Sequence, residues 1–174
     1  MTRPTDRGLV PGLGAQLAVV GACVDRKPTM AGKPARPLLE ATCTRLGCHR
    51  PIFVGDRLDT DILGARNAGI TSLFVLTGAH GVHDLMDADP DRRPDHIGAD
   101  LGALLEPPQR VVVDGDAARC DGQLVRQIDG DLEVDLTNHD MAAQLSGVRA
   151  LLELVWTDRV PVNHDALSVF NLLH

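Results

Sequence analysis

Apolar residues in the first two thirds of the chain form short continuous runs that alternate with helically spaced positions. The runs at residues 52–54 and 71–76 are of the kind that parallel sheets bury on both faces. Residues 37–46, 60–68 and about 82–88 carry the spacing of amphipathic helices, and glycines follow the first two of these segments. Alternating strands and helices with short connections predict an α/β fold, a partial doubly wound (Rossmann-like) parallel sheet.

The two ends of this region are less regular. Residues 95–97 are expected to add an edge strand and residues 101–105 a short helix. A further helix is expected from about residue 11 to 24, where four apolar residues share one face: Leu13, Leu17, Val20 and Val24. Its Gly12-Leu13-Gly14 is interpreted as a helix start rather than a phosphate loop, because no strand is expected before it and no third glycine follows at the dinucleotide spacing.

The pattern changes after Pro107-Pro108. Three Asp-Gly pairs, at residues 114–115, 121–122 and 129–130, separate segments of alternating polarity and predict hairpin turns. We expect strands near residues 111–113, 123–128 and 132–136, then a helix that starts at Asp140. These elements form a small α+β appendage of antiparallel hairpins plus one helix. The expected division is therefore a core over residues 1–106, an extension over 109–160 and a frayed tail over 161–174.

Composition narrows the classes of function. The net charge of −7 argues against a general nucleic-acid binder, and the scarcity of aromatic residues (three Phe, one Trp, no Tyr) argues against base-stacking platforms. The longest apolar run, residues 17–24, is far shorter than the roughly 18–20 residues of a membrane span. Nothing resembles a signal peptide, and four cysteines without CxxC spacing indicate reduced, buried thiols. We therefore expect a cytoplasmic protein that binds neither nucleic acid nor membranes.

Negative charge is concentrated in the segment Gly55-Asp-Arg-Leu-Asp-Thr-Asp61, directly after an apolar run. In an open parallel sheet, ligands bind outside the carboxyl ends of the strands. Asp59 is well placed to cap the helix that follows. Asp56 would project into the crevice, where an unpaired carboxylate is costly unless it finds a cation, and Mg²⁺ is the natural candidate.

A basic residue supports a phosphate site at the same place. Lys33 lies in Gly32-Lys33-Pro34, a turn between a flexible and a rigid residue. A lysine and a carboxylate–metal site on adjacent loops form an electrostatic clamp for a phosphoryl group. Taken alone, a lysine in a turn is usually a solvated surface residue. Its significance comes from the buried strand that follows about twenty residues later and ends in Gly55-Asp56.

The segments Ala31-Gly-Lys-Pro34 and Ile52–Ile62, followed by residues 65–69 and 73–78, resemble the third and fourth motifs of the haloacid dehalogenase superfamily. Within it, they are similar to the phosphatases with a large α/β (C2-type) cap: the 4-nitrophenylphosphatase, phosphoglycolate and glycerol-3-phosphate phosphatase group. The resemblance spans about residues 5–105. It implies a Mg²⁺-dependent hydrolase of small phosphorylated metabolites. In such an enzyme Lys33 steadies the phosphoryl group, Asp56 ligates Mg²⁺, and Asp61 supports or shares that coordination.

The resemblance also implies parts that the sequence does not show. That family uses a nucleophilic aspartate and a second aspartate two residues later, on a strand that precedes the phosphate-binding motifs and the cap. None of these stands before Lys33, so the chain is expected to be a C-terminal portion that is inactive alone. Val111-Val-Val-Asp-Gly-Asp116 imitates the missing motif, but the Asp-Gly series favours a hairpin there.

Two functions therefore stay open. One is the phosphatase, represented here by a fragment; the other is a non-catalytic α/β module, derived from such an enzyme, that binds a partner or a metal. The absence of a central strand predicts an exposed sheet edge and an exposed apolar face, and with them marginal stability or self-association through that edge. His80 and His83 are interpreted as loop residues, because no third metal ligand is evident, and Cys43, Cys48 and His49 match no usual zinc spacing.

Overall fold

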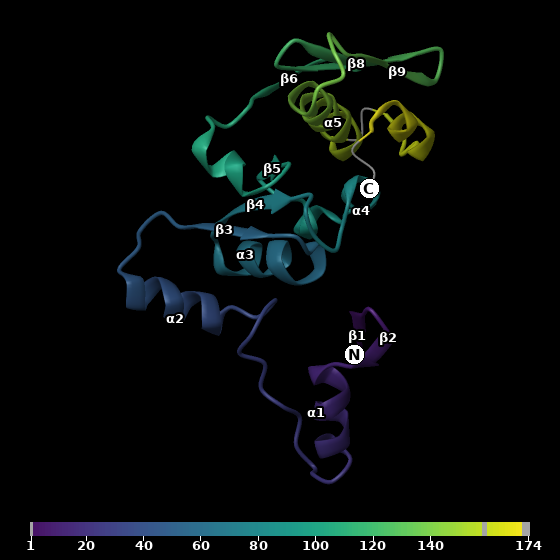
Figure 1. Ribbon diagram of the computed structural model, residues 1–174. Helices are drawn as coiled ribbons and strands as arrows, with labels where there is room; N and C mark the ends of the chain where they lie inside the picture. The colour runs from purple at the N-terminus through teal and green to yellow at the C-terminus, as the bar shows by residue number, and fades with distance from the viewer. Residues whose placement is uncertain (1, 158–159, 172–174) are drawn as a thin grey trace. The chain divides into compact units, whose positions relative to one another are not determined.

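The computed structural model describes residues 2–157 and 160–171 (Figure 1). Contacts divide the chain into two units, Met1–Ala31 and Gly32–His174, and each is described by itself. The domain limits expected from the sequence, at residues 106–109 and 160–161, stay a prediction.

The first unit is a hairpin followed by a helix. Strand β1 (Thr2–Thr5) pairs antiparallel with β2 (Gly8–Pro11), and α1 (Leu13–Gly21) follows directly. The expectation that no strand precedes Gly12 was wrong, because β2 ends directly before it. The chain enters β2 at Gly8, whose positive φ of 107° a glycine adopts without strain. Helix α1 is also shorter than expected, and none of its residues is buried.

The second unit begins with the predicted parallel sheet. Its three strands run in the order β3 (Ile52–Gly55), β4 (Thr71–Val75) and β5 (His96–Gly98), and all pairs are parallel. The accompanying helices are α2 (Pro37–Leu46), α3 (Leu63–Ala68) and α4 (Val82–Met86). Figure 1 shows α3 lying along β3, where it covers one face of the sheet. The α/β class and the alternation of elements are confirmed.

Two local details differ from the expected helices. The helix expected from residue 60 begins with a π-helical turn, Leu58–Ile62, before α3. Helix α4 ends at Met86, two residues early. The short helix expected at Leu101–Leu105 is present, and it is of the 3₁₀ type. Only the first difference lies next to the candidate site.

The appendage is a four-stranded antiparallel meander, β6 (Val111–Asp114), β7 (Ala117–Cys120), β8 (Gln123–Ile128) and β9 (Asp131–Asp135). Two of its turns are the pairs Asp121-Gly122 and Asp129-Gly130, whose aspartates have positive φ of 45° and 53°, and the first turn begins at Gly115, directly after Asp114. Asp114 pairs with Ala117 across the first hairpin, which confirms the hairpin interpretation of the Asp114-Gly-Asp116 segment. Strand β7 was not predicted, because Ala-Ala-Arg-Cys carries neither β-branched nor aromatic residues.

Helix α5 (Met141–Trp156) covers the meander, as Figure 1 shows. Asp140 caps it, since its carboxylate accepts a hydrogen bond of 2.8 Å from the Ala143 N–H. The end of α5 also contacts the parallel-sheet region, where Trp156 Nε1 donates to the Leu85 carbonyl at 2.9 Å. Arg149 donates two hydrogen bonds to the Ile97 carbonyl, so its half-buried guanidinium joins α5 to β5.

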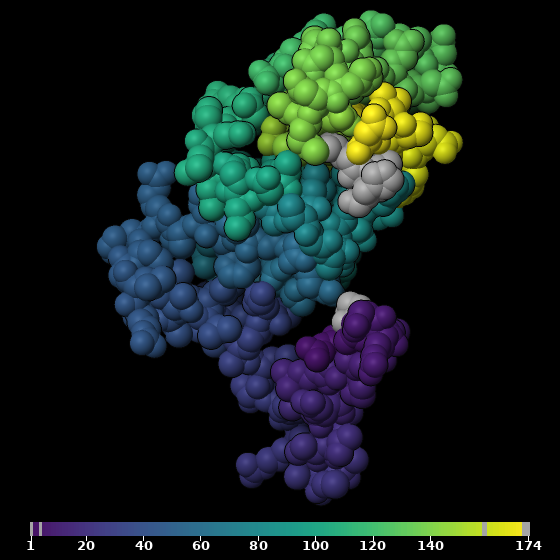
Figure 2. Space-filling model, viewed as in Figure 1, coloured from purple at the N-terminus to yellow at the C-terminus, as the bar shows by residue number. Residues whose placement is uncertain are grey.

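Residues 161–171 are packed against the rest of the second unit, whereas a frayed tail was expected from residue 161 to 174; its last three residues lie outside the described part of the chain. Residues His164–Val169 form a 3₁₀ helix, and Leu167 and Phe170 are buried. A Cβ on Gly147 would lie 2.7 Å from the Phe170 ring, so the ring occupies the space that this glycine leaves on α5. In Figure 2 the yellow C-terminal segment lies against the light-green surface of α5.

The cysteines only partly match the expected buried thiols. Cys120 is buried, Cys43 and Cys48 are half-buried, and Cys23 is exposed. Within the described parts of the chain, no helix has the length and apolar character that a membrane crossing requires.

Candidate functional site

The loop after β3 is shaped by a close contact between Gly55 and Asp61. The backbone turns through the π-helical segment, so the Ile62 N–H reaches the Arg57 carbonyl at 3.1 Å. This wider turn folds Asp61 back over the end of the strand. A Cβ on Gly55 would lie 2.3 Å from the Asp61 Cβ, a separation that real atoms do not tolerate. A side chain at position 55 would therefore collide with Asp61, which occupies that space. π-helical turns such as this one often mark functional sites.

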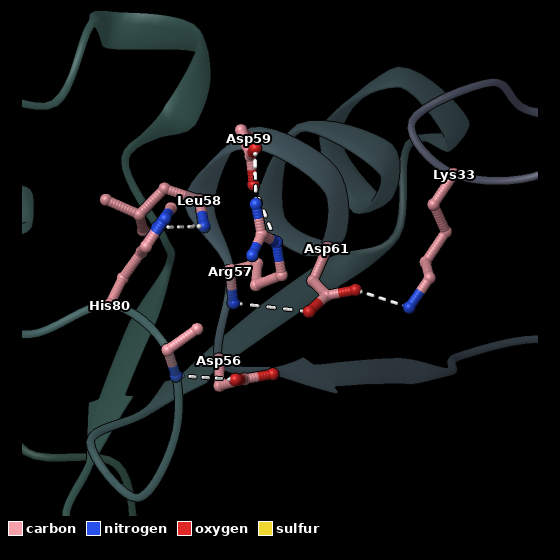
Figure 3. Close-up of polar contacts among 8 residues, drawn as sticks. Lys33, Asp56, Arg57, Leu58, Asp59, Asp61 and His80 are labelled. Atoms are coloured by element: carbon pink, nitrogen blue, oxygen red, sulfur yellow. Dashed lines mark hydrogen bonds and ion pairs between the residues drawn. The ribbon is translucent and has the colours of Figure 1, made fainter. Parts of the chain in front are cut away.

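Asp61 holds the ammonium group of Lys33. The Asp61 side chain is 5% exposed, and its Oδ1 lies 2.5 Å from Lys33 Nζ (Figure 3). Its other oxygen accepts the Arg57 N–H at 3.2 Å, so the buried carboxylate is satisfied at both oxygens. Lys33 Nζ also lies 5.6 Å from the centre of the Phe53 ring. The lysine is thus fixed at the carboxyl end of β3 although it is 42% exposed.

Asp56 belongs to the same edge of the sheet but has different partners. Its Oδ2 accepts the Ala79 N–H at 2.7 Å, from the loop after β4. A Cβ on Gly78 would lie 2.1 Å from that oxygen, so Gly78 must lack a side chain for the two loops to meet. The hydrogen bonds within the described residues leave Asp56 Oδ1 available. Figure 3 shows the Asp56 and Asp61 carboxylates and the Lys33 ammonium gathered at this end of β3.

Asp59 faces away from this group and pairs with Arg57. Two hydrogen bonds of 3.1 and 2.8 Å join the guanidinium to the Asp59 carboxylate. These bonds hold the pKa of the Asp59 carboxyl below its usual range, and the same pairing raises the pKa of Arg57. The expectation that Asp59 caps a helix was wrong: it lies inside the π-helical turn, whose N-terminus has no side-chain cap.

His80 contributes to the loop, which the sequence interpretation missed. Its Nδ1 accepts the Leu58 N–H at 3.0 Å, and the His80 backbone N–H donates to the Asp56 carbonyl at 3.2 Å. His80, in the loop after β4, therefore stabilises the loop after β3 that carries Asp56. Its position after the carboxyl end of β4 was the signal that could have identified it. His83 is separate, and its Nδ1 lies 3.0 Å from Nδ1 of His164.

The donor set fits a magnesium ion at Asp56 better than at Asp61. Mg²⁺ is commonly held by one or two carboxylates, waters and a phosphate oxygen. Among the described residues, one carboxylate oxygen of Asp56 has no protein donor, whereas both oxygens of Asp61 already have donors. Across residues 2–157 and 160–171, no group of three His, Cys, Asp or Glu side chains gathers as a metal site. The site roles of Lys33, Asp56 and Asp61 stay predictions.

A cavity of about 290 Å³ lies elsewhere in the second unit. Its lining includes Ile52, Ile97, Leu104, Arg149 and Trp156, between the parallel sheet and α5. Lys33, Asp56 and Asp61 do not line it. The candidate site is therefore an open edge defined by its charged groups rather than an enclosed pocket.

Comparisons with known proteins point in one direction. Residues 30–104 match the family model described as HAD-hydrolase-like. D-glycerol 3-phosphate phosphatase of Mycobacterium tuberculosis is 39% identical, over 94% of this chain and 47% of that protein. Phosphoglycolate phosphatase 2 of Arabidopsis thaliana is 36% identical, over 60% of this chain and 36% of that protein. The chain thus spans about half the length, or less, of these relatives.

Solved structures agree. The crystal structure of a glycerol phosphate phosphatase from M. tuberculosis in complex with magnesium is 34% identical, with a TM-score of 0.68. That similarity covers 99% of this chain and 53% of the other. The 4-nitrophenylphosphatase of Thermotoga maritima matches with a TM-score of 0.53 and 38% identity, over 59% of this chain and 40% of that one.

Proposed function

We propose that the chain supplies the phosphate- and metal-binding part of a Mg²⁺-dependent phosphatase acting on small phosphate monoesters, because residues 30–104 match the HAD-hydrolase-like family model and its relatives are named as phosphatases. The observation that carries this proposal is the grouping of Lys33, Asp56 and Asp61 at the carboxyl end of β3. Relatives whose names are those of phosphatases favour this function over a non-catalytic binding module.

Each side chain has a distinct role in the proposal. Lys33 presents positive charge to the phosphoryl oxygens, and the buried Asp61 holds the ammonium in position. Asp56 carries the metal on its free oxygen, while the Ala79 N–H fixes the other oxygen. A bound Mg²⁺ would neutralise phosphate charge and orient the ester. Asp61 then acts through Lys33, unless that ion pair opens and a carboxylate oxygen turns to the metal.

The substrate class follows from the relatives. They are named as phosphatases of D-glycerol 3-phosphate, phosphoglycolate and 4-nitrophenyl phosphate, so a small phosphorylated metabolite is proposed here. The cytoplasmic location expected from the sequence stays a prediction. Self-association also belongs to the proposal, since β3 has no neighbour on its outer edge within the described residues and Ile52 is 50% exposed.

The 174-residue chain by itself is proposed not to turn over substrate. Hydrolysis in this family needs an aspartate that attacks the phosphorus, and in the described residues no further carboxylate joins Asp56 and Asp61 at the site. Hydrolysis of p-nitrophenyl phosphate with Mg²⁺ should stay at the uncatalysed level. Turnover that disappears in an Asp56→Asn variant would show that the chain is sufficient.

Binding is the more direct test. A ligand that binds only the folded state at 100 times its Kd stabilises that state by about 2.7 kcal/mol. Titration with MgCl₂, alone and with inorganic phosphate, should raise the thermal midpoint of the natural chain. Asp56→Asn should lose the magnesium response, and Lys33→Met should lose the additional phosphate response. An equal response in all three proteins would contradict the proposed site.

A further inference from the structure

Helix α2 ends in a motif that brings two cysteines together. Gly47 adopts the left-handed conformation, with φ of 62°. The Gly47 N–H donates to the Thr44 carbonyl and the Cys48 N–H to the Cys43 carbonyl, both at 3.2 Å. This pair of bonds defines a Schellman motif, in which the side chains four positions before and one after the left-handed residue contact each other. In this chain those two positions are Cys43 and Cys48.

The Cys48 side chain reaches Cys43 across the end of the helix. The Cys48 thiol donates to the Cys43 carbonyl at 3.6 Å. The Cys48 N–H and the Cys48 thiol thus both donate to the Cys43 carbonyl, which keeps the two residues adjacent, and the proximity of Cys48 raises the pKa of the Cys43 thiol. A disulfide needs Cα atoms roughly 4.4–6.8 Å apart, and the 3.2 Å backbone bond holds the two residues at this scale. Closing a bridge therefore needs side-chain rotation rather than rearrangement of the backbone.

The exposure of Cys43 and Cys48, and the positions of the other two cysteines, also favour a reversible reaction between this pair. Both cysteines are half-buried, so a small oxidant can reach them. Cys120 is buried under α5, and Cys23 belongs to the first unit. We propose that Cys43 and Cys48 form a redox-sensitive dithiol that a peroxide converts to an intramolecular disulfide across the end of α2.

The reaction balances with hydrogen peroxide as the oxidant. One thiol attacks the peroxide, an S–O bond forms as the O–O bond breaks, and a sulfenic acid and one water result. The second thiol then displaces the hydroxyl group, so that an S–S bond forms as the S–O bond breaks and a second water leaves. Two thiols lose two electrons in total and one peroxide gains them. A dithiol reductant reverses the reaction by thiol–disulfide exchange.

The sequence provides a direct readout, because trypsin cleaves after Arg45, between the two cysteines. The folded chain at low concentration is treated with stoichiometric H₂O₂, alkylated, digested and analysed by mass spectrometry. We expect the peptides that contain Cys43 and Cys48 to be joined in most molecules and released by dithiothreitol. Non-reducing electrophoresis should show a monomer.

Single variants identify the pair. Cys43→Ser and Cys48→Ser should each abolish the linked peptides and leave the other thiol as a sulfenic acid that dimedone traps. Cys23→Ser is the matched control and should give the same linked peptides as the natural chain. Linkage of Cys48 to Cys23 or to a second chain would overturn the proposal, as would two thiols that stay free after oxidation of the folded chain.

Discussion

Gly55 and Asp61 compete for one space at the end of β3, since a Cβ on the glycine would lie 2.3 Å from the Asp61 Cβ. Gly55→Ala should therefore displace Asp61 and its ion pair with Lys33. Overpacking of this kind costs about 1–3 kcal/mol. We expect a lower midpoint in urea unfolding. In thermal unfolding, the rise of the midpoint on addition of Mg²⁺ or phosphate should be lost.

Gly81→Ala is the matched control for that substitution. Gly81 lies in the same unit, has an ordinary extended backbone with φ of −125°, and no atom lies within 4 Å of the position of an added Cβ. Its stability should change by less than about 0.5 kcal/mol. If the two alanine variants behaved alike, the contact between Gly55 and Asp61 would not determine the shape of the loop.

Removing Lys33 and removing Asp61 from their ion pair should lower the free energy of unfolding by different amounts. Lys33→Met leaves a buried carboxylate with one remaining donor, the Arg57 N–H, and should cost about 1–3 kcal/mol. Asp61→Asn keeps an acceptor for Arg57 and leaves a lysine that is 42% exposed, so it should cost less, about 0.5–1.5 kcal/mol. Urea unfolding of both variants at neutral pH measures the difference.

Arg36→Met is a suitable control for the loss of a cation. Arg36 pairs with Glu40 on α2, and both side chains are well exposed, so its removal should have an effect near zero. A larger cost for Asp61→Asn than for Lys33→Met would contradict this ranking of the two partners.

Trp156 reports on the contact between α5 and α4, and it is the only tryptophan in the chain. Its Nε1 donates to the Leu85 carbonyl at 2.9 Å, while Arg93 donates to its carbonyl at 2.7 Å and lies over its ring. Trp156→Phe removes the donor to a part-buried carbonyl and should cost about 1–2 kcal/mol. Arg93→Met should move the tryptophan emission to longer wavelength in the folded protein, because the contact loosens and water reaches the ring. Unchanged emission would mean that Arg93 has no part in docking α5.

The parallel sheet and the meander were predictable because their signals are local. Apolar runs such as residues 52–54 and the Asp-Gly pairs specify strands and turns within a few residues of chain. Strand β7 and the buried Phe170 were not predictable, since Ala-Ala-Arg-Cys owes its pairing to the hairpins on either side and Phe170 packs on Gly147 from a distant part of the sequence.

The candidate site shows the same division. The sequence identified Lys33, Asp56 and Asp61, and the structure brings them to one sheet edge. The sequence did not reveal that Asp61 forms an ion pair with Lys33, 28 positions away, or that Asp59 pairs with Arg57. Carboxylates at the end of a strand have the same spacing whether they face a metal, a lysine or an arginine. Only the π-helical turn, which follows from packing, assigns them to different partners.

Cys120 makes stability depend on alkaline pH. Burial raises the pKa of its thiol above the ordinary value of 9.0, although the neighbouring Arg149 partly opposes that shift. The folded state therefore keeps a proton that the unfolded state releases, so stability is unaffected well below pH 9 and falls as the pH rises through that value. The slope approaches about 1.4 kcal/mol per pH unit until the folded thiol also ionises.

Urea unfolding between pH 7.5 and 10 measures this dependence, and the absence of tyrosine removes one group that would otherwise titrate in that range. Cys120→Ala should lower stability at pH 7.5, because it leaves space beneath α5, yet lose stability less steeply toward pH 10 than the natural chain. Cys23→Ala, at an exposed position, is the control and should keep the natural slope. Equal slopes for the natural chain and Cys120→Ala would mean that the Cys120 thiol ionises as readily in the folded state as in the unfolded one, which its burial beneath α5 argues against.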